Sequence, residues 1–371
     1  MKKRLYVLIL IVFLAFGCFW GYKNRDELMM YFNNQDWKQA EVTGTTTLSN
    51  HFAIDGTSSN LIVVGNNYLH GFSNNGEENF DMNVSLKNAV TSATGDYCII
   101  GEKDGTKVYM INSNAKIWEM DIQGTLLDVS VNKNGYSAII YKQVGYKSLI
   151  RVMKPDGTEL FTTYLASTYA LDAEISNDNK TLAIAEINTE GIKVESIVEL
   201  INMSDLEKKN STKFVLEDDT LITNIEYNSK NKLLIQTDSG IQIVDNNELK
   251  VFIDKFDTNT KFVTIENESS PVVISKIENG LFDSSYILKI FDYKENDVTY
   301  EEYQIDDLPS ILASKDNKIA MLIEKELIIV NLNGKLLKKY DVSGNIKSII
   351  IFNNGNSLAV IYRDKMEFMK I

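Results

Sequence analysis

The sequence predicts an all-β chain that folds as an eight-bladed β-propeller and carries one N-terminal transmembrane helix. Pairs of short β-branched runs, joined by Asn and Gly turns, recur through the chain, as in Ile346–Tyr362. The recurrence has a mean period of about 43 residues, which is the length of a four-stranded propeller blade. A charge-free run follows basic residues at the N-terminus, as expected for a membrane segment.

The N-terminal region predicts a membrane anchor. Residues 1–4 form a basic cytoplasmic segment, and residues 5–22 carry no charge and reach about 27 Å as a helix, close to the thickness of a bilayer core. Residues 23–37 follow as a stalk, and residues 38–371 form the propeller. Basic residues are retained in the cytoplasm, so we expect a single-pass protein of the cell membrane with an extracytoplasmic propeller.

Two other interpretations of this segment stay open. Ala15-Phe16-Gly17 offers a small-x-small site, so residues 5–22 can be read as a cleaved signal peptide. Cys18 can be read as a lipidated cysteine, although its preceding residues fit a lipobox poorly. All three interpretations place the propeller outside the cytoplasmic membrane.

Each repeat begins with a turn between its first and second strands. These turns lie at Asp55-Gly56, Gly95-Asp96, Asn134-Gly135, Asp178-Asn179, Lys230-Asn231, Ser269-Ser270, Asp316-Asn317 and Asn354-Gly355. An apolar second strand follows each turn, for example Leu61–Val64 and Leu358–Ile361. Such runs are typical of strands that are buried on both faces.

The count of second turns predicts how the ring closes. Eight first turns are followed by only seven turns between a third and a fourth strand, because the chain ends after Met366–Lys370. An open blade would leave an unpaired sheet edge. We therefore expect Lys38–Thr45 to pair with Met366–Lys370 and complete the eighth blade. Seven blades are the alternative if the degenerate unit 262–305 is not a blade.

The fourth-strand openings carry a resemblance. Asn75-Gly76-Glu77-Glu78-Asn79-Phe80, Asn114-Ala115-Lys116-Ile117-Trp118 and Asp156-Gly157-Thr158-Glu159-Leu160-Phe161 resemble the turn-then-aromatic repeats of quinoprotein-like (PQQ-like) and WD-repeat-like (WD40-like) propellers. With its single N-terminal span, the chain also resembles a family of membrane-anchored propellers in Gram-positive bacteria. The resemblance covers residues 40–371 and implies a fold, not a function.

The sequence contains no recognisable catalytic constellation. A quinone cofactor would need a stacking Trp in the funnel, and neither Trp37 nor Trp118 lies where a funnel loop is expected. His51 and His70 have no nucleophile and orienting acid at an interpretable spacing. Asn177-Asp178-Asn179 and Asp104-Gly105 lack the spaced acids of a calcium loop and read as turns. We therefore expect no enzyme activity and no cofactor.

The charge of the chain limits its partners. The net charge is −13, and beyond residue 25 the chain carries 33 basic and 51 acidic residues. An acidic surface repels phosphate backbones, so nucleic acid is excluded as a partner. Cys18 and Cys98 lie in different kinds of segment, which argues against a disulfide.

Three successive connections between blades are acidic and form the predicted partner-binding rim. Their residues are Glu217, Asp218, Asp219, Asp254, Asp257, Asp306 and Asp307. Connections of adjacent blades share one face, so these carboxylates should form an arc that attracts a basic segment or a calcium ion. The alternative is that these loops have no binding function, because acidic loops are ordinary in so acidic a chain.

These observations predict a membrane-tethered propeller that binds or scaffolds another protein of the cell envelope or membrane. The alternatives are an envelope-assembly subunit similar to BamB, and a propeller enzyme, either a quinone-dependent oxidoreductase or a hydrolase. Binding usually concentrates on the longer loops of a rigid scaffold, so we expect partners on the face that carries the connections between blades.

Overall fold

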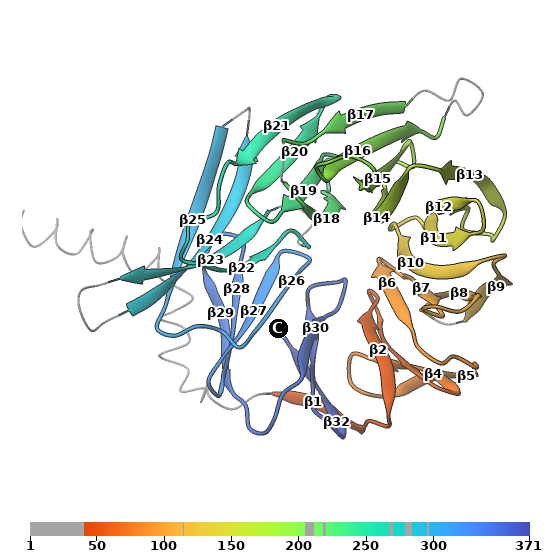
Figure 1. Cartoon of the computed structure of the whole chain (residues 1–371). Coiled ribbons are helices and arrows are strands. Elements are labelled where there is room, and N and C mark those ends of the chain that lie inside the picture. The colour runs from red at the N-terminus through yellow and green to blue at the C-terminus, as the bar shows by residue number, and fades with distance from the viewer. Residues whose placement is uncertain are drawn as a thin grey trace, which may run out of the picture.

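The structure is a computed structural model that describes residues 41–113, 115–204, 211–217, 220–266, 270–278, 284–294 and 297–371. In these residues, 32 strands form eight four-stranded antiparallel sheets. The sheets follow one another around a central axis like the blades of a propeller (Figure 1). The predicted eight-bladed fold is therefore confirmed. We number the blades 1 to 8 in chain order, with the first strand of each blade next to the axis.

Blades 1 to 4 occupy the first half of the ring. Blade 1 contains β2 (His51–Gly56), β3 (Asn60–Gly65), β4 (Tyr68–Ser73) and β5 (Glu78–Asn83). Blade 2 contains β6 (Val90–Thr94), β7 (Tyr97–Gly101), β8 (Lys107–Asn112) and β9 (Lys116–Asp121). Blade 3 contains β10 (Thr125–Val131), β11 (Ser137–Gln143), β12 (Tyr146–Met153) and β13 (Glu159–Leu165). Blade 4 contains β14 (Thr168–Ile175), β15 (Thr181–Asn188), β16 (Glu195–Asn202) and β17 (Ser211–Val215).

Blades 5 to 8 complete the ring. Blade 5 contains β18 (Ile222–Tyr227), β19 (Leu233–Thr237), β20 (Ile241–Asp245) and β21 (Glu248–Ile253). Blade 6 contains β22 (Thr260–Thr264), β23 (Val272–Glu278), β24 (Ser284–Lys294) and β25 (Asp297–Ile305). Blade 7 contains β26 (Ile311–Lys315), β27 (Lys318–Ile323), β28 (Glu326–Asn331) and β29 (Leu336–Asp341). Blade 8 contains β30 (Ser348–Ile351), β31 (Ser357–Ile361), β32 (Lys365–Lys370) and β1 (Val42–Thr47).

The hydrophobic core lies between the blades rather than at one centre. Strands β3 and β31 are buried along their whole length, as their uninterrupted apolar sequences predict. Between blades 1 and 2, for example, Ile62 and Leu69 pack in one cluster with Ile100 and Ile111. The outermost strands β5 and β9 instead alternate between exposed and partly buried residues, because successive side chains point to opposite faces of the sheet and only one face is packed there.

The N-terminal strand closes the ring, as predicted. β1 is the outermost strand of blade 8 and pairs antiparallel with β32, with Val42 opposite Met369 and Thr47 opposite Lys365. Its bounds are later than expected, and residues 38–40 of the predicted segment lie outside the described residues. β1 also contacts blade 1, where the Thr46 hydroxyl donates a hydrogen bond of 2.7 Å to the Gly76 carbonyl.

The structure decides two points of the predicted repeat, the unit 262–305 and the first turn of blade 1. The degenerate unit 262–305 is a complete blade, so the seven-bladed alternative is wrong. The sequence predicts the first turn of blade 1 at Asp55-Gly56, but both residues belong to β2. The turn comes after them because the Thr57 hydroxyl accepts a hydrogen bond from the Asn60 amide, which holds residues 57–60 in a tight turn.

The antiparallel order gives the propeller two distinct faces. The turn face carries the turns between first and second strands and between third and fourth strands. The connection face carries the turns between second and third strands and the connections between blades. Hydrogen bonds join neighbours on each face: Asn134 Nδ2 donates to the Asn177 carbonyl on the turn face, and the Asp104 amide donates to the Leu126 carbonyl on the connection face.

The predicted membrane anchor, residues 5–22, and the predicted stalk, residues 23–37, lie outside the described residues. Within the part of the chain that the structure does describe, no helix has the length and apolarity needed to span a membrane. The described chain begins its first strand, β1, at the turn face. The third-to-fourth turn of blade 1 is adjacent there, since the Thr43 hydroxyl donates to the Asn74 carbonyl at 3.2 Å.

Candidate binding surface

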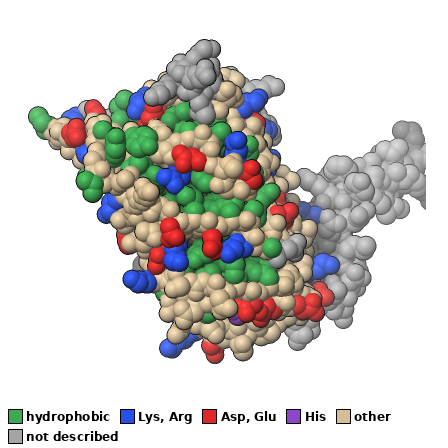
Figure 2. Space-filling model, turned by 90° about the vertical axis from the view of Figure 1, so that its right-hand side faces the viewer, with side chains coloured by type: hydrophobic (Ala, Val, Ile, Leu, Met, Phe, Trp, Pro, Cys, Tyr) green, Lys and Arg blue, Asp and Glu red, His purple; other side chains and the backbone are tan. Residues whose placement is uncertain are grey.

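A group of exposed apolar side chains lies on the connection face of blades 3 and 4. We call it the apolar patch and define it as Val144, Tyr146, Tyr164, Tyr169 and Ile192. Val144 and Ile192 are 99% and 107% exposed, because both belong to turns between second and third strands. Figure 2 views the side of the molecule formed by blades 2 and 3, where apolar side chains gather between charged ones.

Lys147 links blade 3 to blade 4 within the apolar patch. Its ammonium lies 5.0 Å from the Tyr169 ring centroid and donates a hydrogen bond to the Ser167 carbonyl. It also pairs with Glu190 at 2.9 Å, which joins blade 3 to the turn that carries Ile192. The rings of Tyr146 and Tyr164 lie 5.0 Å apart. The patch is therefore built on strand ends and an ion pair rather than on isolated side chains.

Three members of the apolar patch, Val144, Tyr146 and Tyr169, line a hollow of about 590 Å³ together with Lys147. Aromatic residues that surround a hollow on a rigid surface are the usual anchors of protein–protein interfaces. The apolar patch is not among the sites predicted from the sequence. A signal existed, since the Gln143–Gly145 turn places a valine where most turns of this chain carry Asn, Asp or Gly.

The described residues of the predicted acidic rim are all exposed. Glu217 follows β17, Asp254 and Asp257 lie between β21 and β22, and Asp306 and Asp307 lie between β25 and β26. All three segments are connections between consecutive blades and share the connection face, whereas Asp218 and Asp219 lie outside the described residues.

Two rim carboxylates also stabilise their own loops. Asp257 Oδ1 accepts a hydrogen bond from the Asn259 amide, and Asp307 Oδ1 accepts one from the Leu308 amide. Among the described residues, none of the rim acids belongs to a cluster with the spacing of metal ligands. A calcium ion or a basic partner at the rim stays a prediction.

A second set of acids lies next to the axis, on the first strands of the blades. Asp55, Asp128 and Asp172 each accept a hydrogen bond of 2.8–2.9 Å from the amide of the following residue. Burial raises the pKa of the Asp128 carboxyl, and it raises that of Asp172 to about 6, where the nearby Asp128 charge adds to the effect. Burial also raises the pKa of the Asp55 carboxyl, against the attraction of Lys315.

Glu174 completes the axial group. Burial raises the pKa of its carboxyl well above the ordinary value, and the charges of Asp172 and Glu226 act in the same direction. These four acids were not predicted as site residues, because acids on strands are less conspicuous in the sequence than acids clustered in loops. The available signal was a carboxylate at the centre of an apolar first strand, as in Thr125–Val131 and Thr168–Ile175.

Histidine 70 lies between two carboxylates on the outer strands of blade 1. Its Nε2 is 3.4 Å from Asp81 Oδ1, and its Nδ1 is 3.8 Å from Glu78 Oε2. These three residues form the one group with metal-ligand spacing among the described residues. The carboxylates approach different ring nitrogens, however, so this arrangement suits a histidine held between two acids better than three ligands that converge on one ion.

The remaining residues singled out in the sequence have structural positions. Trp118 lies in β9, the outermost strand of blade 2, far from a funnel, and Trp37 lies outside the described residues. Cys98 is a free, buried thiol in β7, and His51 begins β2. Asp104 and Asn179 adopt positive φ angles of 62° and 60°, which supports their interpretation as turn residues.

Solved structures with the same fold are dissimilar in sequence. The C-terminal WD40 domain of Sif2 matches with a TM-score of 0.58 and 14% identity, covering 90% of this chain and 99% of that domain. BamB from Moraxella catarrhalis matches with a TM-score of 0.52 and 12% identity, covering 90% of this chain and all of that one. The dihydro-heme d1 dehydrogenase NirN, in complex with DHE, gives 0.55 and 10%, covering 89% of this chain and 79% of NirN.

Similarity at this level of identity shows the fold alone, and it confirms the predicted likeness to WD40-like and BamB-like propellers. The predicted membership of a membrane-anchored Gram-positive family stays a prediction. No curated protein matches the sequence. A family model, described as a family of unknown function (DUF5711), matches residues 33–371. Because this match covers the whole propeller, the chain belongs to the DUF5711 family.

Proposed function

We propose that this protein is a membrane-tethered, extracytoplasmic propeller that binds another protein of the cell envelope or membrane through its connection face. The apolar patch is the observation that carries this proposal. Val144 and Ile192 are fully exposed and bury no apolar surface in the propeller, and the tyrosines of the patch are about half exposed; exposed apolar patches usually mark interaction sites. The role is that of a binding or scaffolding module rather than of a catalyst.

The charges on the connection face support a partner with a basic segment. The apolar patch lies on blades 3 and 4, and the described rim acids follow blades 4, 5 and 6. The two features are therefore consecutive around the ring. A partner that inserts apolar side chains at the patch would meet Glu217 and then Asp254 and Asp257 along its path. Such rim charges mainly increase the association rate and select the orientation of the partner.

The entry point of the chain supports the same orientation. β1 begins at the turn face, so a tether preceding residue 41 reaches the propeller from that side. The connection face is the opposite one, and we propose that it is the face turned toward the envelope partner. A role in envelope assembly similar to that of BamB is a finer version of this proposal, and it rests only on the shared fold.

The experiment compares variants of the full-length chain in native membranes. Val144→Asp and Ile192→Asp place charges in the apolar patch, and Val215→Asp and Val251→Asp are matched controls on outer strands, where the valines are 59% and 57% exposed. After cross-linking and mild detergent extraction, we expect a stoichiometric partner with the wild type and both controls. With the patch variants, the yield of recovered partner should fall at least about tenfold, as expected for loss of a central apolar anchor.

Two outcomes would overturn the proposal. One is recovery of the same partner at the same yield with the double patch variant, provided that its melting temperature matches that of the controls. The other is a stoichiometric partner whose recovery depends on Val215 and Val251 but not on the patch, which would move the interface to the outer strands.

A further inference from the structure

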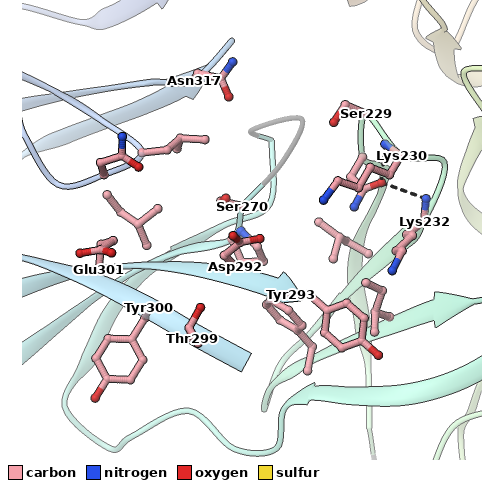
Figure 3. Close-up of a pocket in the computed structure, with 18 of the residues that line it drawn as sticks. Ser229, Lys230, Lys232, Ser270, Asp292, Tyr293, Thr299, Tyr300, Glu301 and Asn317 are labelled. Carbon is pink, nitrogen blue, oxygen red and sulfur yellow. Dashed lines mark hydrogen bonds between the residues drawn. The ribbon is translucent and has the colours of Figure 1, made fainter. Parts of the chain in front are cut away.

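The turn face contains a cavity that the proposed function does not use. It has a volume of about 530 Å³, within the range of roughly 300–1,000 Å³ that is usual for small-molecule sites. Its walls come from the first turn of blade 5, from β24 and β25 of blade 6, and from two turns of blade 7. In Figure 3, Lys230 and Lys232 lie on one side, Glu301 lies on the other, and Asp292 and Ser270 lie between them.

Three lysines line this cavity in a protein that is otherwise acidic: Lys230, Lys232 and Lys318. Lys232 is already neutralised, because its Nζ lies 2.9 Å from Asp245 Oδ2 and 4.7 Å from the Tyr293 ring centroid. Lys230 and Lys318 have no carboxylate within ion-pair distance among the described residues. The cavity therefore offers two ammonium groups that a bound anion can use.

The amide of Asn228 adds a donor, and comparison between blades shows why. In blade 3, Asn132 Oδ1 accepts hydrogen bonds from the amides of Asn134 and Tyr136, and its Nδ2 donates to the Ser176 carbonyl of blade 4 at 2.9 Å. In blade 5, Asn228 Oδ1 accepts the equivalent bonds from Lys230 and Lys232.

The hydrogen bond of the side-chain NH₂ differs between the two blades. Asn228 is only 7% exposed and lines the cavity, and its Nδ2 has no hydrogen-bond acceptor among the described residues. The Nδ2 atom is not one of the fully enclosed polar atoms that lack a partner, so it is open to the cavity and can donate to water or to a ligand there. A ligand oxygen at this point would provide an acceptor.

The walls of the cavity away from Lys230 and Lys232 have a different chemistry. Asp292 and Glu301 are carboxylates, which accept hydrogen bonds from hydroxyl groups, and Thr299 and Tyr300 lie beside them. The Tyr293 ring lies 5.7 Å from the Phe252 ring, and both aromatic residues line the cavity. Among the described residues, no arginine lines the cavity, so none of them offers the paired hydrogen bonds with which arginine recognises a carboxylate. Lysine binds phosphate as a point charge.

We infer that this cavity binds a small phosphorylated polyol, such as a sugar phosphate. The phosphate lies between Lys230 and Lys318 with the Asn228 amide as a further donor, and the hydroxyl groups face Asp292 and Glu301. This site is independent of the apolar patch, because the two lie on opposite faces of the propeller.

Isothermal titration with the full-length protein in detergent tests this inference. The probes are glucose 6-phosphate and glycerol 3-phosphate, compared with glucose and inorganic phosphate as halves of the ligand. We expect a sugar phosphate or polyol phosphate to bind with a Kd below about 1 mM, and each half at least tenfold more weakly, since both ends contribute to the free energy of binding. Binding should also weaken with added salt.

Variants connect the binding to this cavity. Lys230→Ala combined with Lys318→Ala should weaken binding at least tenfold, and Asn228→Asp should weaken it while keeping the oxygen that accepts the turn hydrogen bonds. Lys133→Ala, in the corresponding turn of blade 3, is the matched control and should bind as the wild type does.

Each contrary result overturns a defined part of the inference. Failure of both phosphorylated probes to bind at about 10 mM would reject the site. Equal binding of inorganic phosphate would reject the polyol, and equal weakening by Lys133→Ala would place the anion elsewhere. None of these results bears on the apolar patch, whose test uses different variants.

Discussion

Glu186 is fully buried between blades 3 and 4, and its surroundings explain how the fold tolerates a carboxyl group there. The Thr168 hydroxyl donates to its Oε2 at 2.5 Å. Lys213 Nζ lies 3.6 Å from Oε1 of Glu186 and 3.1 Å from Oε2 of Glu199. Burial, with the neighbouring Glu199 acting in the same direction, raises the pKa of Glu186 to about 7. One ammonium thus serves two carboxyl groups.

This pair makes stability depend on pH. Because the pKa of Glu186 is raised on folding, its contribution to stability is present below about pH 4.5 and is lost as the pH rises through about 7. Lys213→Met should lower the free energy of unfolding by about 2 kcal/mol at pH 8 and by less at pH 5. Adding Glu186→Gln should restore most of the loss at pH 8.

Urea denaturation at the two pH values measures both effects. Lys116→Met, which removes an exposed ammonium 2.6 Å from Glu119, is the control and should change stability by less than about 1 kcal/mol. Equal losses at pH 5 and pH 8 for Lys213→Met would contradict the assigned role of Glu186.

Asp172 gives a second prediction at the same scale. Its pKa is raised to about 6, so it destabilises the propeller increasingly as the pH rises from about 4 to 6. Asp172→Asn removes the charge and keeps an oxygen for the Ala173 amide, but it loses the bond that Oδ2 accepts from the Ile225 amide at 3.2 Å. Removal of the charge is worth up to about 3 kcal/mol at pH 7.5 and the lost bond costs about 1–2 kcal/mol, so we expect a net stabilisation of about 1 kcal/mol at pH 7.5 and none at pH 4. Thermal melts should show no comparable gain for Asp364→Asn, an exposed acid. A lower melting temperature for Asp172→Asn at pH 7.5 would contradict the prediction.

Among the elements, β1 closes the ring, although its polar sequence does not suggest a structural role. Its pairing with β32 covers the edge that would otherwise end the last blade, and Phe368 of β32 is fully buried. β1 also passes close to the next blade. A Cβ atom added at Gly44 would lie 1.8 Å from the Asn75 carbonyl oxygen, so any side chain here must displace backbone.

Removal of β1 should therefore open the ring. We expect deletion of residues 42–47 to lower the melting temperature sharply, with a loss of several kcal/mol because one exposed sheet edge replaces two paired strands. Gly44→Val should reproduce part of the loss, and Thr47→Ala, in the same strand, should have little effect. Calorimetry that finds the deletion variant as stable as the wild type would reject closure by β1 as a source of stability.

For the whole molecule, the two faces give a prediction of topology. If residues 5–22 anchor the chain with residues 1–4 in the cytoplasm, the propeller lies outside the membrane. Protease added to intact spheroplasts should then degrade the propeller, and a membrane-impermeant label should reach it. A propeller that is protected until lysis would reverse the assignment. Release of the propeller into the medium would favour a cleaved signal peptide over an anchor.

The fold could be predicted from the sequence more completely than the binding sites could. The buried second strands, the eight repeats and the closing pair all follow from local patterns, because blade strands alternate with turns at a fixed spacing. The predicted position of one turn, Asp55-Gly56, was wrong because the true turn is held by a single threonine side chain, that of Thr57. The predicted rim residues do share one face, as the order of strands requires, but nothing brings them together into a metal-ligand cluster among the described residues.

The sequence by itself determined the number of blades, the strand that closes the ring and the assignment of each loop to a face. These properties depend on periodicity and chain order, which can be read along the chain. Only the tertiary structure decided which side chains meet. The residues of the apolar patch are spread from position 144 to position 192, and those that line the lysine-lined cavity are spread from position 228 to position 333. Such contacts depend on how neighbouring blades are packed, and no local pattern encodes the distance between two side chains in different blades.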